Sequence, residues 1–377
     1  MRKEDIKKLS QPYDNSNTDI HRRFNSAIGA DVPSAGQLAE EIFNDLDEND
    51  FGISWWNNLP KEERILISDY LYQCAGDIET NLVEAKLHFL EWLSAKEKSN
   101  DRIANAIYRD STGKLDFKMP PPITPLDDLP DALKALHICG FFRAIGSILD
   151  CLGATIIGVL ALPKDLRKAS IDNTEKALKK IKDSGASNLQ TDFLNFYEGA
   201  KKSCGVEDWL EWADQYRNTY VHRGRRTTAF NVHAREILLY DSNGQINPRA
   251  ESTTHLSKYP DRTDIEAFIK SKDIWLNEDA EVTLNGIFNS CRNFVEIVSE
   301  QLLSIWQQRR INPTLLEQPQ IQWEKLFKVC NFAGYDTNSQ PLNSDSGRLN
   351  GILIHRMLSA SVFDHQRNFW KNSKWKQ

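Results

Sequence analysis

Apolar residues recur at steps of three and four positions along much of the chain, which is the pattern of amphipathic helices. Polar capping residues precede several of these periodic segments, and glycine follows some of them, as is typical of helix ends. The 377-residue chain is therefore predicted to be mainly α-helical, with helices over 34–46, 59–98, 131–162, 172–185, 188–203, 206–222 and 264–310.

Two segments interrupt the helical pattern. Residues 118–130 are rich in proline, which lacks an amide donor and restricts the residue before it, so an extended linker is predicted there. Residues 236–247 change to an apolar and β-branched run around Asn243 and Gly244, a dipeptide typical of tight turns. A small β-hairpin inserted between helices is predicted from this run.

These interruptions divide the predicted fold into four parts. We expect a helical N-terminal domain over 1–117, the linker over 118–130, a helical bundle over 131–310 and a C-terminal extension over 311–377. Composition agrees with a globular protein, because 40% of the residues are hydrophobic and 27% are charged.

Charge is divided unevenly between these parts. The chain carries a net −6, whereas residues 1–110 alone hold 21 acidic and 13 basic side chains, a net of −8. The remainder is therefore slightly positive, at +2. We expect the acidic N-terminal domain to lie near a basic region of the rest and to limit access to it.

The most apolar stretch, 144–162, is predicted to be a buried core helix rather than a membrane span. Asp150 interrupts it, and the uncharged run that follows is shorter than the roughly 20 residues that a spanning helix needs. Four glycines between 131 and 162 are expected to let neighbouring helices approach closely. A polar N-terminal segment and six scattered cysteines favour a cytoplasmic protein without membrane partners.

A basic segment follows the predicted helix 206–222. From Arg217 to Arg235 there is no acidic residue, and five arginines occur: Arg217, Arg223, Arg225, Arg226 and Arg235. His222 lies five positions after Arg217, and the polar Asn218 lies between them. In a helix Asn218 and His222 share one face, and the guanidinium of Arg217 can reach round to the same anion.

Spacing alone does not single out this arginine–histidine pair. Three other pairs have a similar spacing: Arg226 and His233, Arg249 and His255, and Arg348 and His355. Arg217 is the member of the set that precedes a polar amide at the end of a long amphipathic helix. An aromatic stripe of Trp209, Trp212, Tyr216 and Tyr220 on the same helix is expected to pack it against the core.

These residue types suit cleavage of RNA. Histidine titrates near neutral pH and acts as a general acid or base, while arginine stays charged and binds phosphate through two parallel hydrogen bonds. No Cys/His cluster has the spacing of a zinc site, so neither a metal nor another cofactor is expected. The alternative is structural, because cations at a helix C-terminus also complement the helix dipole.

The segment RNTYVH, with its helical flanks and the Arg-Gly that follows, resembles the motif of the HEPN domain family. The resemblance implies an all-helical, usually dimeric bundle over 131–310 and a metal-independent endoribonuclease in defence, toxin or RNA processing. It implies catalytic roles for Arg217, Asn218 and His222. Because no acidic residue interrupts the positive charge, Arg223, Arg225, Arg226 and Arg235 are expected to bind RNA. An antitoxin or regulatory partner would accompany such an enzyme.

A second hypothesis stays open from the sequence. Because some HEPN domains do not cleave RNA, the chain could be a helical interaction module that binds a partner protein or RNA without cutting it. The basic, aromatic end of the chain, 366–377, also has two interpretations. Its lysines and tryptophans suit single-stranded RNA, or its tryptophans pack on the body of the protein.

Overall fold

The computed structural model describes residues 32–45, 61–105, 107–109, 112, 115–117, 129–183, 187–222, 229–235, 249–312 and 314–316. Of these residues 79% are helical, which confirms the mainly α-helical prediction. The chain forms two compact units, one built around 78–149 and 197–297, and the other around 34–77, 150–196 and 298 onward. They are called unit 1 and unit 2 below.

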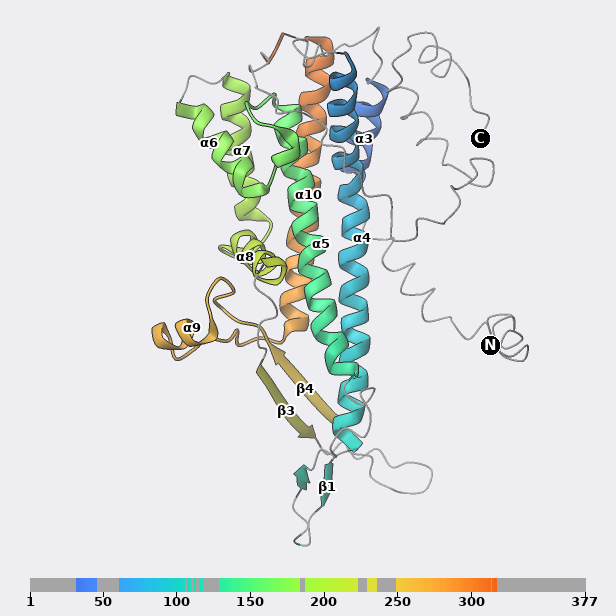
Figure 1. Ribbon diagram of the computed structural model, residues 1–377, viewed down its shortest axis with the longest axis vertical. Coiled ribbons are helices and arrows are strands. Elements are labelled where there is room, and N and C mark those ends of the chain that lie inside the picture. Colours follow the sequence, from blue (N-terminus) through green and yellow to red (C-terminus); the bar gives the residue numbers. More distant parts are fainter. Residues whose placement is uncertain are drawn as a thin grey trace, which may run out of the picture. The chain divides into compact units, whose positions relative to one another are not determined.

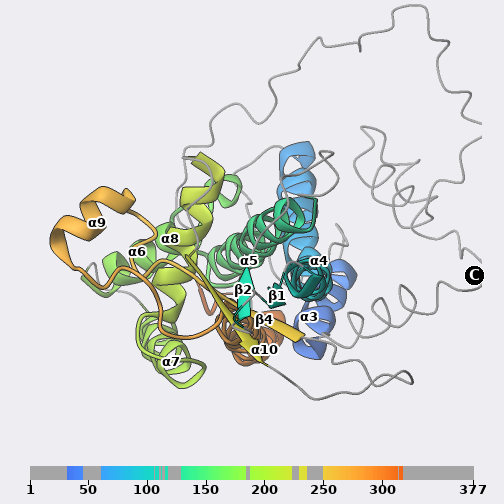
Figure 2. The same ribbon diagram turned by 90° about the horizontal axis from the view of Figure 1, so that it is seen from below.

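Unit 1 is a bundle of helices with two short strand pairs. It contains the later part of α4 (Lys61–Asn105), most of α5 (Leu129–Val159), α8 (Trp209–His222), α9 (Asp264–Lys270) and the first part of α10 (Ala280–Ile311). Within this unit α8 lies across the long helices, as the two views show together (Figures 1 and 2). The side chain of Lys86 on α4 lies over the ring of Phe288 on α10.

Unit 2 collects the remaining helices. These are α3 (Pro33–Asn44), the first turns of α4, the end of α5, a short 3-10 helix (Leu166–Lys168), α6 (Ile171–Asp183), most of α7 (Asn188–Ser203) and the end of α10. Buried Arg309 on α10 donates to the carbonyl oxygens of Gly158 and Val159, so it caps the C-terminus of α5. Burial lowers the pKa of Arg309 to about 9, which still leaves its guanidinium charged at neutral pH.

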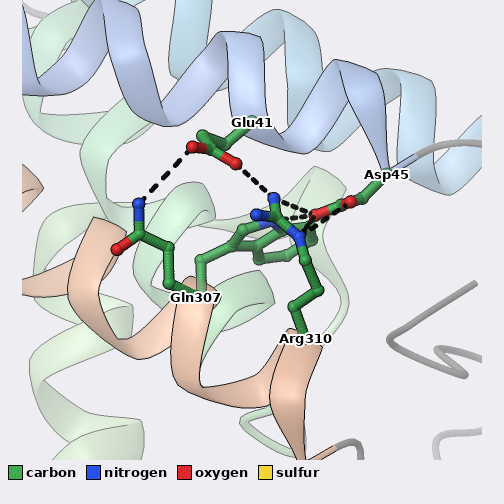
Figure 3. A network of polar contacts seen from close by, with 5 residues as sticks. Glu41, Asp45, Gln307 and Arg310 are labelled. Atoms are coloured by element: carbon green, nitrogen blue, oxygen red, sulfur yellow. Dashed lines mark hydrogen bonds and ion pairs between the residues drawn. The ribbon is translucent and has the colours of Figure 1, made fainter.

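An ion-pair cluster attaches α3 to the end of α10 in unit 2 (Figure 3). The guanidinium of Arg310 contacts the carboxylates of Glu41 and Asp45, with its Nε 2.8 Å from Asp45 Oδ2. Trp306 donates its indole N–H to the same carboxylate oxygen at 2.6 Å. Gln307 extends the cluster by donating to Glu41, so three residues of α10 anchor Glu41 of α3 and Asp45, which directly follows that helix.

The glycines of α5 admit close contacts, as the sequence predicted. A Cβ atom at Gly140 would lie 2.3 Å from the ring of His88 on α4, and one at Gly146 would lie 2.4 Å from Arg217 Cγ on α8. In unit 2, Gly153 meets the start of α6 and Gly158 meets Leu71 of α4. Four positions without a side chain therefore let α5 touch three other helices.

Burial of α5 follows the sequence prediction too. Leu129–Val159 is the one described helix that is long and apolar enough to cross a membrane, and 78% of its most apolar window is buried inside the protein. Phe141, Phe142, Ile145, Ile148 and Leu149 have no exposed surface. The helix therefore forms core in both units.

The strands differ in position from the predicted hairpin. Antiparallel strands β3 (Ala229–Arg235) and β4 (Arg249–His255) are paired over their full length, from Ala229 opposite His255 to Arg235 opposite Arg249. They flank 236–247, where the hairpin was predicted, and that segment lies outside the described residues. Asn100 of α4 holds β4 by accepting the backbone N–H of Ser252 at 3.0 Å.

The predicted continuous helix 264–310 is two helices instead. α9 ends at Lys270 with Ser271 in an extended conformation, and α10 begins at Ala280. Residues between them bridge back to the core, where Leu276 donates its N–H to the carbonyl of Leu256 at 2.8 Å. A local helical period cannot reveal this return, because the contact joins residues twenty positions apart.

The compact units divide the chain differently from the predicted domains. Most of the predicted linker, 118–128, lies outside the described residues, so that boundary stays a prediction. However, the later part of α4, which the sequence analysis placed in an N-terminal domain, packs in unit 1 against the bundle. Lys96 of α4 donates to Asp279 at 2.7 Å and to Glu281 of α10 at 2.9 Å.

Two histidines meet where α4 and α5 pack together in unit 1. The Nδ1 atoms of His88 and His137 are 3.0 Å apart, so one ring donates a hydrogen bond to the other. Burial lowers the pKa of both rings. The guanidinium of Arg143 lowers the pKa of His88 further, and the ring of His88 lowers the pKa of His137 further. Carboxylates at Glu84 and Glu91 oppose this lowering for His88 without cancelling it.

We predict that this pair makes unfolding depend on pH near neutrality. The folded protein binds protons at these rings more weakly than the unfolded chain, whose histidines titrate near about 6.5. The contribution of the pair to the free energy of unfolding is therefore fully present above that pH. It should fall as the pH drops through about 6.5, by about 1.4 kcal/mol for each tenfold weakening of proton binding. Urea denaturation between pH 8 and pH 5 measures the slope.

The double variant His88→Gln, His137→Gln is the comparison, because glutamine keeps polar atoms at both positions and does not titrate. It should have a flatter dependence of unfolding free energy on pH across this range. Equal slopes for the parent and the double variant would show that the pair does not control the dependence.

Candidate functional site

The candidate site lies on α8, and an aromatic face fixes this helix in unit 1. Tyr216 is fully buried and stacks on Phe142 of α5, with ring centroids 4.6 Å apart. Tyr220 stacks on the same ring at 6.3 Å, and Trp212 meets it edge-on at 5.7 Å. The predicted packing role of the aromatic stripe is therefore confirmed.

Two hydrogen bonds hold the C-terminal half of α8 to the segment that follows β4. The phenol oxygen of Tyr216 accepts the backbone N–H of Ser257 at 3.0 Å. One turn further, the hydroxyl of buried Thr219 donates to the carbonyl of Pro260. These contacts and the aromatic stacking set the rotation of α8 about its axis, so the direction of its polar side is fixed too.

Three polar side chains of α8 form a chain of hydrogen bonds. Arg217 Nη1 donates to Asn218 Oδ1 at 2.9 Å, and Asn218 Nδ2 donates to Asp214 Oδ2 at 2.8 Å. An amide has one accepting oxygen and one donating nitrogen, so the two bonds determine its orientation. Asp214 therefore orients Asn218, and Asn218 in turn orients the guanidinium of Arg217.

Arg217 also rests on α5. Its Cγ, Nε and Cδ atoms would lie 2.4, 2.7 and 2.9 Å from a Cβ atom at Gly146, so its aliphatic stem occupies the space that a side chain there would fill. The side chain as a whole is partly exposed. Arg217 is thus held along its stem by α5 and at its charged end by Asn218.

The other predicted site residues are placed less completely. His222 is the last residue of α8, one helical turn after Asn218, and its side chain lies outside the described residues. The same is true of Arg223, Arg225 and Arg226 as a whole. Arg235 ends β3, where its cross-strand partner is Arg249, so two cationic residues are paired in the backbone register.

This arrangement can bind an anion. Arginine remains charged at any physiological pH and matches the geometry of phosphate oxygens. Here its guanidinium is held by fixed contacts rather than moving freely at the surface, so less conformational entropy is lost when an anion binds. The backbone of α8 puts Asn218 and His222 one turn apart on a single face.

Sequence reasoning missed the role of Asp214. Its four-residue step to Asn218 is the signal that could have revealed it, because residues four apart in a helix are neighbours. The contact between Gly146 and Arg217 was missed in a different way. The sequence predicted that a helix would approach a glycine of α5, but which side chain would fill the space depends on packing between distant segments.

Comparison with known proteins identifies no relative: no family model, no characterised protein and no solved structure matches the chain.

We predict that Gly146→Ala displaces Arg217 and gains little stability. Alanine is favoured over glycine inside a helix by about 0.5–1 kcal/mol, but the new methyl group would occupy the position of the arginine stem. Gly286→Ala on α10 is the matched control, because no atom lies within 4 Å of a Cβ atom there. Urea denaturation should show the full gain for the control alone.

The double variant Gly146→Ala, Arg217→Ala separates steric conflict from other causes. Removing the stem should restore the gain from alanine, so the two substitutions should be non-additive. Equal stabilisation by Gly146→Ala and Gly286→Ala in the parent would contradict the contact.

Proposed function

We propose that the chain is a metal-independent endoribonuclease of the HEPN type, with Arg217, Asn218 and His222 as its catalytic residues. The observation that carries the proposal is the orientation of Arg217 by Asn218 and Asp214 on the helix that ends at His222. An arginine with a merely structural role at a helix C-terminus would not need an amide fixed beside it. Preorganised charge is often the largest contribution to a reaction that builds charge.

The proposed reaction is attack by the 2′-hydroxyl of RNA on the adjacent phosphate. A histidine takes the 2′-hydroxyl proton as the oxygen–phosphorus bond forms, and the bond from phosphorus to the 5′-oxygen breaks as that oxygen receives a proton. Arg217 binds the phosphate oxygens on which negative charge increases, and Asn218 keeps the guanidinium in position. The products are a 2′,3′-cyclic phosphate and a 5′-hydroxyl.

The reaction needs both a general base and a general acid. His222 supplies one in each chain, so a homodimer with two motifs facing one cleft would supply both. A role in defence, as a toxin or in RNA processing, with an antitoxin or regulatory partner protein, accords with this proposal. The arginines at 223, 225, 226 and 235 would bind the RNA backbone.

A second candidate function is binding of a partner protein without catalysis. Helix α9 favours it, because Ile265, Phe268 and Ile269 are 73%, 60% and 78% exposed on a helix of seven residues. Neighbouring apolar side chains that remain in water are typical of surfaces that bind other proteins. Under this hypothesis incubation with the protein would leave RNA intact.

We expect the parent protein to cleave single-stranded RNA in excess EDTA, because histidine and arginine supply the acid, the base and the positive charge. His222→Ala and Arg217→Ala should each lower the cleavage rate about 10²–10⁴-fold. Arg217→Lys should fail too, since an ammonium group cannot reproduce the two parallel hydrogen bonds of a guanidinium. Gel analysis and mass spectrometry of the fragments measure rates and end groups.

Gln215→Ala on the same helix is the control, and it should retain full activity because its side chain bonds only to Glu211 among the described contacts. A 2′-deoxy nucleotide at the cleaved position should block the reaction. Cleavage that requires a divalent metal and leaves 5′-phosphate ends would rule out this mechanism.

Asp214 is expected to act as a positioning residue. Asp214→Ala removes the acceptor that orients Asn218, and misplacement of a catalytic group can cost about 10²-fold. The exchange Asp214→Asn with Asn218→Asp should recover much of the rate. In that variant Asn at 214 donates to the carboxylate at 218, which still accepts from Arg217.

The single variant Asn218→Asp tests the same chain of hydrogen bonds. It places two carboxylates in contact, so the pKa of one should rise and activity should improve as the pH falls. If the exchanged pair were as inactive as Asp214→Ala, the orientation of Asn218 would not be what Asp214 provides.

A further inference from the structure

Arg143 differs from the other charged residues of α5. Most of that helix is buried, and the side chains on both sides of Arg143 in the sequence, Phe142 and Ala144, are 0% and 2% exposed. Arg143 itself is exposed, and the structure records no ion pair or hydrogen bond for its guanidinium among the described residues. By contrast, Lys134 on the same helix is paired with Asp131 at 2.8 Å.

The position of Arg143 links it to the candidate site. The stem of Arg217 packs against Gly146, which lies three residues further along α5. Residues at this spacing are neighbours about 5–6 Å apart on a helix surface. The ring of His88 packs against Gly140, three residues before Arg143. Arg143 therefore stands between the contacts of His88 and Arg217 with α5, close enough to His88 to lower the pKa of that ring.

We infer that Arg143 binds a second phosphate of the RNA whose scissile phosphate is held by Arg217. This inference rests on the proposed ribonuclease function. An arginine that protrudes from an apolar helix beside a second arginine presents two guanidinium groups toward one polyanion. Consecutive phosphates of a single strand would meet Arg217 and Arg143 in turn, so the strand would run from the C-terminal end of α8 onto α5.

RNA is favoured over a single small anion because the two cations belong to different helices, Arg143 to α5 and Arg217 to α8. Arg217 is already oriented by Asn218, and Arg143 projects from a different helix, so the two groups do not form one compact cage. A chain of phosphates can contact both without moving either. Neutralising each phosphate of a single strand releases counterions, which contributes about 0.7 to the slope of log affinity against log salt.

The test measures binding of a fluorescent single-stranded RNA to full-length protein that carries His222→Ala, so that the RNA stays intact. In this background Arg143→Gln should lower the salt slope by about 0.7 and weaken binding across different sequences. Lys176→Gln is the matched control, because it removes one exposed positive charge from α6 in unit 2. Its slope should equal that of the background protein.

Arg143→Glu is a second variant that should weaken binding more than Arg143→Gln, since it places a negative charge beside the phosphate. Unchanged slopes in both Arg143 variants, with RNA still bound and cleaved by the parent, would overturn the role of Arg143 and leave the ribonuclease proposal standing. If the parent protein neither bound nor cleaved RNA, the proposed function itself would fail.

Discussion

Contact with α5 can be close only where that helix carries no side chain, and its glycines determine where this happens. At Gly140 the ring of His88 fills the space, and at Gly146 the stem of Arg217 fills it. Many of the residues of α5 around these positions are apolar and buried, whereas Arg143, which lies between the two glycines in the sequence, is exposed. The position of Arg217 therefore depends on the missing side chain at Gly146 as well as on the hydrogen bond to Asn218.

The polar side of α8 depends on the apolar side. Stacking of Tyr216 and Tyr220 on Phe142 fixes the rotation of the helix, and the bond from Thr219 to Pro260 fixes its C-terminal end. Only then do Asp214 and Asn218 face a constant direction. Because the hydrogen bonds run along one helix, they need no distant segment to form, but their direction in space is determined by the packing of the whole of unit 1.

Features that depend on neighbouring residues could be predicted from the sequence. The helices, the burial of α5 and the aromatic stripe of α8 follow from periodicity, since the same three- and four-residue steps create both the pattern and the face. Long-range features could not be predicted. The pairing of β3 with β4 joins strands on either side of 236–248, the packing of α4 on α10 connects residues more than 180 positions apart, and the break before α10 depends on a return to Leu256. Of the candidate site, Arg217 and Asn218 lie together as the helix requires, whereas the contacts of Asp214 with Asn218 and of Gly146 with Arg217 became known only with the structure.

The hydrogen bond between His88 and His137 has a consequence for the placement of protons. Both rings meet through Nδ1, and a neutral imidazole carries its single N–H on one nitrogen only. When one ring donates from Nδ1, the other must carry its proton on Nε2. Two chemically identical side chains are therefore held in opposite tautomers, and the arrangement can be reversed by exchanging the two roles. The contact between α4 and α5 thus has two tautomeric forms with the same geometry. The N–H of the hydrogen bond points toward α4 in one form and toward α5 in the other.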